Sequence, residues 1–124
     1  MKDPFLATLV KTVHDHSLSF GITLITQGGV ISGHLISTKE YFEDFSNSIA
    51  NAWPGGPSED VRSGFAAWSE FRKADDAGHD EFIHLKNARY VYGNQLVPNG
   101  KIGILWRGKL SEVTGFSLGA CEVS

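Results

Sequence analysis

The chain has 124 residues and a formal net charge of −3, with 41% hydrophobic and 20% charged residues. These values are typical of one folded domain and exclude extensive disorder. A single cysteine, Cys121, excludes an intrachain disulfide, and no apolar run approaches the ~20 residues of a membrane span. The first residues, MKDPFLATLV, do not have the pattern of a secretory signal. We therefore expect one cytoplasmic domain over residues 1–124.

The first third predicts a helix followed by a β-hairpin. Asp3-Pro4 places a capping side chain before a proline that favours the first helical position. Two β-rich runs follow, Leu18–Thr26 and Val30–Ser37, and Gln27-Gly28-Gly29 between them predicts a tight turn. Gly33 inside the second run indicates a bend or bulge. The helix has one apolar stripe, formed by Phe5, Leu6, Leu9, Val10 and Val13.

The middle predicts a helical insertion at about residues 37–77. Ser37-Thr38-Lys39-Glu40 has the capping-box spacing that begins a helix, and Asn51–Pro57 ends it. Ser58 can cap a second helix that ends at Gly78. The apolar faces of the two helices are Tyr41, Phe42, Phe45 and Ile49 in the first, and Val61, Phe65, Trp68 and Phe71 in the second.

The last third returns to strand character. Phe82–Tyr92 predicts a long strand that bends near Asn87, and Gly93–Gly100 predicts a loop. Two further strands are expected, at Ile102–Trp106 and at Gly115–Val123.

The order of elements predicts an α+β fold, mainly β with helices. We expect a small, five-stranded, strongly bent antiparallel barrel of the Sm-like or SH3-like kind, with an N-terminal helix and the helical insertion between strands 2 and 3. Arg107-Gly108, expected to turn the chain before the last strand, is similar to the arginine-glycine of the second Sm signature. The Asp and Asn with which the first Sm signature contacts RNA have no counterpart, so RNA binding is an alternative function with weaker support.

A series of short segments also carries a family resemblance. The segments are VISGHLISTKEYF, FIHLKN, WRGKLSEV and GFSLG, within Phe20–Phe45 and Phe82–Gly119. In this order they resemble the GvpU-type gas-vesicle accessory proteins, and such a series is more specific than a lone motif. The resemblance implies an accessory role in gas-vesicle production or clustering, with vesicle shell or other accessory proteins as partners.

Catalytic or metal-binding groups are not indicated. His79, Asp80, Glu81 and His84 are ligand-type residues, but a strand sends Glu81 and His84 to opposite faces, so we expect a polar strand entry with His84 near the surface. Cys121 lacks a neighbouring base and is expected to be a small buried residue. We therefore expect no enzymatic activity, no metal and no cofactor.

The candidate binding residues are cationic and aromatic. Acidic residues outnumber basic ones by ten to four in Thr38–Glu81, whereas Phe82–Ser124 holds five basic and two acidic residues. Such asymmetry favours association between copies or with an oppositely charged partner, although solvated charged faces are the simpler interpretation. For the tryptophan, a place in the core is the alternative to binding. The candidates are Trp106, Arg107, Lys109, Lys86 and Arg89.

Two functions are therefore compared. The first is a non-enzymatic assembly protein that forms homo-oligomers through strand edges and helix faces. The second is an Sm-like RNA-binding module, which the net charge of −3 disfavours.

Overall fold

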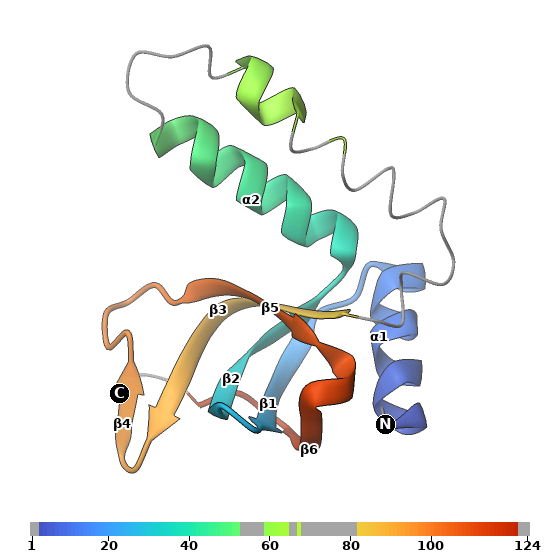
Figure 1. Cartoon of the computed structure of the whole chain (residues 1–124), viewed down its shortest axis with the longest axis vertical. Helices are drawn as coiled ribbons and strands as arrows, with labels where there is room; N and C mark the ends of the chain where they lie inside the picture. Colours follow the sequence, from blue (N-terminus) through green and yellow to red (C-terminus); the bar gives the residue numbers. More distant parts are fainter. Residues whose placement is uncertain (1–2, 53–58, 65–66, 68–81, 122–124) are drawn as a thin grey trace.

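Figure 1 shows a computed structural model of the chain, which describes residues 3–52, 59–64, 67 and 82–121. A short helix also covers residues 59–64. In chain order, the other elements are α1 (Pro4–His16), β1 (Phe20–Thr26), β2 (Gly29–Ile36), α2 (Thr38–Ala52), β3 (Phe82–Tyr92), β4 (Gln95–Val97), β5 (Ile104–Lys109), the 3-10 turn η2 (Leu110–Glu112) and β6 (Val113–Leu118).

The six strands form one antiparallel sheet in the order β4-β3-β2-β1-β6, with β5 also paired to β3. β3 is the central strand, because β2 covers one of its edges while β5 and β4 share the other. β5 pairs with its first part, from Phe82 to Ala88, and β4 pairs with its last part, from Tyr90 to Tyr92. The predicted antiparallel pairing and the predicted β1–β2 hairpin are confirmed.

α1 forms as the sequence predicts and packs on one face of this sheet, which we call the inner face. The Asp3 carboxylate accepts a hydrogen bond from the Phe5 backbone N–H at 2.9 Å, and the helix ends at Ser17 in a left-handed conformation. Its buried stripe belongs to the hydrophobic core, whose members are Leu6, Val10, Val13, Ile22, Leu24, Ile31, Leu35, Ile83, Leu85, Ala88, Leu110 and Val113.

The bends in β2 and β3 lie against each other. The pairing between these strands shifts register between Ser32 and His34, on either side of Gly33. A Cβ at Gly33 would lie 3.0 Å from the Cα of Ala88, so this close approach of two backbones favours glycine. Asn87 has a positive φ of 49°, and its side-chain oxygen accepts the Gly103 N–H at 2.7 Å. Both predicted bends are therefore confirmed.

α2 lies on the opposite face of the sheet, the outer face (Figure 1). It begins where the capping box predicts, since the Ser37 hydroxyl accepts the Glu40 N–H at 3.0 Å. The ring of Tyr41 lies 4.6 Å from that of His84, a β3 residue between the inward-facing Ile83 and Leu85. The helix thus covers the start of β3 from the side that α1 does not contact.

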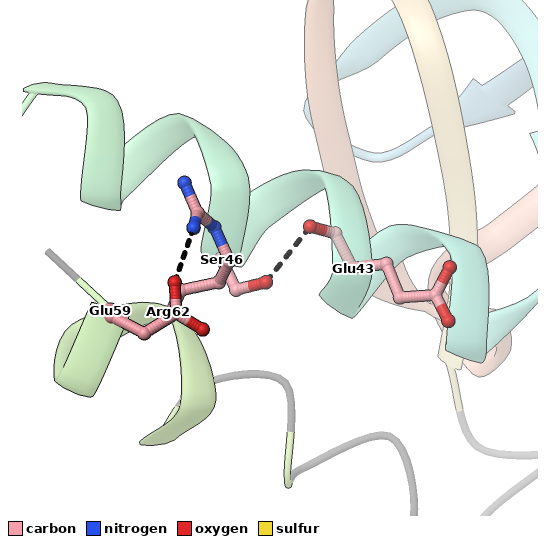
Figure 2. A network of polar contacts seen from close by, with 4 residues as sticks. All are labelled: Glu43, Ser46, Glu59 and Arg62. Carbon is pink, nitrogen blue, oxygen red and sulfur yellow. Dashed lines mark hydrogen bonds and ion pairs between the residues drawn. The ribbon is translucent and has the colours of Figure 1, made fainter.

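The short helix at residues 59–64 matches part of the predicted second helix. On this helix Arg62 pairs with Glu59 at 2.7 Å, and on α2 the Ser46 hydroxyl donates to the Glu43 carbonyl at 2.9 Å. Figure 2 shows both contacts. The predicted cap at Ser58 and the stripe residues Phe65, Trp68 and Phe71 lie outside the described residues. None of the helices described is long and apolar enough to cross a membrane.

The prediction of a five-stranded barrel requires correction. The sheet has six strands, and no pairing joins β5 to β6 in the described ranges, so a closed or Sm-like barrel is not confirmed. The additional strand is β4, within the predicted loop Gly93–Gly100. Arg107-Gly108 does not turn the chain, because both residues pair with β3 and the turn falls at η2. A glycine fits at position 108 because the Trp106 ring occupies the space that a Cβ would need.

Candidate binding surface

β3 and β5 place a row of cations on the outer face of the sheet. Residues two apart on a strand share a face, and Phe82 and His84 of β3 lie opposite Lys109 and Arg107 of β5. Lys86 continues the same face of β3. We call Lys86, Arg107 and Lys109 the cationic row; three of the five predicted binding residues therefore share one surface.

Arg107 is the most fixed member of the cationic row. It is exposed, and its guanidinium carbon lies 3.7 Å from the centre of the Phe82 ring and 5.8 Å from that of Phe42. Its Nε–H donates to the His84 Nε2 at 3.1 Å. The accepting nitrogen must carry a lone pair, so this bond is made by a neutral imidazole. Ring stacking and this bond together orient the guanidinium of this exposed residue.

His84 is buried, with 2% of its surface exposed, so the prediction that it lies near the surface is wrong. The reason is α2, whose Tyr41 ring covers the imidazole at 4.6 Å. Burial raises the pKa of the Tyr41 hydroxyl, and the positive charge of Arg107 opposes that rise. The contact between α2 and the sheet is thus made by the rings of Tyr41 and His84, and Arg107 lies at its border.

Lys86 connects the cationic row to α2. Its ammonium group lies 2.7 Å from the Glu40 carboxylate, and both side chains are partly exposed. One turn further along α2, the pKa of the Asp44 carboxyl is raised, first by burial and then by the negative charge of Glu40, with Lys86 opposing the rise. The acidic start of α2 therefore neutralises one end of the cationic row and leaves Arg107 and Lys109 as its exposed end.

The other two predicted binding residues do not belong to this exposed surface. Arg89 is 4% exposed, and it donates to the carbonyl oxygens of Pro98 at 3.2 Å and Gly100 at 2.8 Å, so it fixes the loop before β5. Trp106 lies on the inner face, packs against the core and donates its ring N–H to the Tyr90 hydroxyl at 3.2 Å. This position matches the core alternative considered for the tryptophan.

The residues considered for chemistry are only partly described. His79, Asp80 and Glu81 lie outside the described residues, and within the described ranges no three His, Cys, Asp or Glu side chains gather as a metal site. Cys121 is exposed, so the prediction of burial is wrong. After β6 the chain crosses the outer face, where the Cys121 N–H donates to the Ser32 hydroxyl at 2.6 Å; the backbone is anchored there and the thiol is not covered.

Sequence reasoning found the cations of this surface but missed the groups that orient them. Phe82 and Phe42, the rings next to Arg107, were interpreted only as a strand residue and as part of a helix stripe. Strand alternation was the available signal, because a core position for Trp106 sends Arg107 to the opposite face.

The comparison with protein families gives one match. A family model described as "Gas vesicle protein GvpU-like" matches residues 3–121. No curated protein and no solved structure gives a match. The matched range includes the hairpin, α2, β3 and β5, and it contains every segment on which the sequence resemblance rests. The chain therefore belongs to the GvpU-like family of gas vesicle proteins.

Proposed function

We propose that this protein is a non-enzymatic accessory protein of gas vesicles, which binds an acidic segment of a shell protein or of another accessory protein through its cationic row. The family supplies the gas-vesicle context. The observation that carries the binding proposal is Arg107, an exposed arginine whose guanidinium stacks on Phe82 and donates to His84.

Preorganisation is the physical reason for choosing this residue. An arginine side chain ordinarily loses conformational entropy when it binds, and a guanidinium already held in place loses less of it. Its planar donors match the two oxygens of a carboxylate, and Lys109 adds a second exposed charge on the same face. An acidic protein segment has the charge that attracts both groups.

The geometry does not favour the RNA-binding alternative. Trp106, the aromatic residue expected to stack on bases, packs against the core. Phe82, the strand residue whose ring lies on the outer face beside the cations, is stacked with Arg107. Base stacking needs an open aromatic face, and neither of these two rings offers the arrangement expected of a single-strand binding site.

Flotation with purified gas vesicles tests the proposal. Vesicles rise on centrifugation, so chain bound to them is measured in the floating layer across a concentration series. We expect the parent to float, and higher salt to weaken its binding, because exposed charges are screened beyond about 8 Å at physiological ionic strength. The paired substitution Arg107→Gln with Lys109→Gln should weaken binding about tenfold or more, which corresponds to about 1.4 kcal/mol.

Two control variants sharpen this test. Lys101→Gln removes an exposed cation from the loop before β5 and should leave flotation unchanged. Arg107→Lys keeps the charge but loses the planar stack, and should give intermediate binding. All variants are first compared with the parent by circular dichroism. A parent that stays in the lower layer, or a double variant that floats as the parent does, contradicts the proposal.

A further inference from the structure

One edge of the sheet has little of the usual protection against strand pairing among the described residues. A register shift interrupts its pairing with β1 between Val113 and Gly115, and the pairing is regular from Gly115 to Leu118. β6 has the sequence VTGFSL, without a charged residue or a proline, and among the described residues only β1 pairs with it. Free strand edges in soluble proteins are commonly protected by lysine, proline, bulges or a covering element. The regular, uncharged run from Gly115 to Leu118 is therefore a template for another strand.

The hydrogen-bond pattern shows which groups β6 offers to a partner. Gly119 donates its N–H to the Gly21 carbonyl at 2.8 Å, so this opposed pair is a hydrogen-bonded one. Bonded and non-bonded pairs alternate along an antiparallel ladder, and Leu118 and Phe116 lie opposite Ile22 and Leu24 in the non-bonded positions. The N–H and C=O groups of Phe116 and Leu118 consequently point away from β1, toward the free edge.

An apolar stripe lies beside these backbone groups. The half-buried Phe116 ring packs against Phe5 of α1, with 5.9 Å between ring centres, and Phe5 is 64% exposed. Leu118, two residues along β6 and on the same face, is 70% exposed. The edge therefore combines unused backbone groups with apolar side chains that gain from burial.

A second copy of the chain fits this edge better than it fits the opposite one. The opposite edge is shared by β4, which has only three residues, and by β5, which carries Arg107 and Lys109, so pairing β5 with itself would oppose like charges. β6 carries no charge, so pairing it with itself brings no repulsion. A two-fold interface requires a self-complementary surface, and a neutral antiparallel strand with one apolar stripe meets that requirement.

We propose that two copies of this chain pair antiparallel through β6, around a two-fold axis at Ser117. In this register, Phe116 of each copy lies opposite Leu118 of the other. Their outward N–H and C=O groups then form two bonded pairs across the axis, and the two apolar stripes become continuous. The proposal specifies the surface of the homo-oligomer expected from the sequence, and it does not rest on vesicle binding. The interface is small, so association in the range of roughly 10 µM is expected.

Ser117 provides a charge-exchange test. Its side chain is exposed on the outer face, and in the paired dimer the two copies of Ser117 face each other across the axis. Ser117→Lys or Ser117→Glu therefore leaves the core untouched but places like charges directly opposite each other. Mixing the two variants in equal amounts places opposite charges there and restores an attractive pair.

The measurement is sedimentation equilibrium of the full chain over about 5–200 µM, a range that brackets the expected affinity. The parent should reach twice the 13.5 kDa mass of one chain. Each Ser117 variant alone should remain near one copy, and their mixture should return to two. Ser48→Lys, at an exposed serine of α2, is the matched control and should behave as the parent does. Circular dichroism confirms that each variant is folded.

Several outcomes would overturn the proposal. A parent that stays at one copy throughout the range rules out pairing at this affinity. Dimers that persist in both charged variants place the interface elsewhere. A mass above two copies indicates head-to-tail contacts between different edges rather than a two-fold axis. A mixture that stays monomeric rejects the register centred on Ser117.

Discussion

Replacing Arg89 with methionine should destabilise the fold far more than replacing the exposed Lys109 does. Arg89 is 4% exposed and holds the loop before β5 through two hydrogen bonds to backbone carbonyls. Methionine keeps an unbranched apolar stem of similar length, so the change removes the donors without emptying the space beside β3.

The magnitude follows from those two bonds. A hydrogen bond from a charged donor contributes about 1.5–3 kcal/mol, so the pair contributes about 3–6 kcal/mol. The bond to Pro98 is the longer one, at 3.2 Å, and Gly100 is exposed, so its carbonyl can bond to water instead. We therefore expect a loss near the lower end, about 3 kcal/mol. Lys109→Met, at an exposed position, should change stability by no more than about 0.5 kcal/mol.

Urea unfolding followed by far-ultraviolet circular dichroism measures both variants at one protein concentration. A loss below about 1 kcal/mol for Arg89→Met would show that the loop carbonyls are rehydrated without cost. An equal loss for Lys109→Met would show that the exposed end of the cationic row is structural. Either result would refute the view that Arg89 is a structural cation and that the exposed cations of the cationic row serve binding.

Two further predictions concern the two faces of the sheet. Trp106→Ala should cost about 2–3 kcal/mol in urea unfolding, below the ~3–5 kcal/mol of a fully buried tryptophan, because the side chain is only partly buried. Trp106→Phe keeps most of the packing and should cost about 1 kcal/mol, for the bond to Tyr90; equal losses in the two variants would contradict this. Burial, followed by neighbouring carboxylates, raises the folded-state pKa of Asp44 above 3.8. Its contribution to stability is therefore complete below pH 3.8 and is lost as the pH rises through the raised value. Asp44→Asn should thus be more stable than the parent at neutral pH, with the difference vanishing in acid, and a gain that is constant across pH would contradict the stated cause.

Local signals explain the parts of the fold that the sequence predicts correctly. The Asp3-Pro4 start of α1 and the Ser37 cap of α2 depend on hydrogen bonds within a single turn. The predicted strand Phe82–Tyr92 has the bounds of β3, and its bend at Asn87 occurs where the backbone adopts a positive φ. Features that depend on residues close in the chain can be inferred from one sequence.

Features that depend on distant residues were predicted less well. β4 has three residues and exists because β3 offers it an edge from Tyr90 to Tyr92, which composition does not reveal. β5 continues through Arg107-Gly108 because β3 pairs with both residues. The burial of His84 requires α2 to fold back over β3. Each of these differences arises from pairing or packing across long sequence separations.

For the candidate surface, the sequence likewise indicates which residue types are suited to binding but not where the fold places them. Five binding residues were selected by type, yet the fold gives them three roles: Lys86, Arg107 and Lys109 form the cationic row, Arg89 fixes a loop and Trp106 packs on the inner face. Strand alternation separates Trp106 from Arg107 without any coordinates. The burial of Arg89 could not be inferred this way, because it depends on a loop that returns to β3.

The two proposals use different strands, so one molecule can engage both contacts. The cationic row lies on β3 and β5, whereas the self-pairing edge is β6, and β5 and β6 are not paired in the described part of the sheet. A two-fold dimer formed through β6 therefore presents two copies of the cationic row. Two linked sites bind a surface of repeated acidic segments more tightly than one does, because the second contact forms at a high effective concentration. The neutral edge would thus determine how many binding sites the assembly presents, and the charged strand would determine the choice of partner, which is the physical basis of the proposed accessory role.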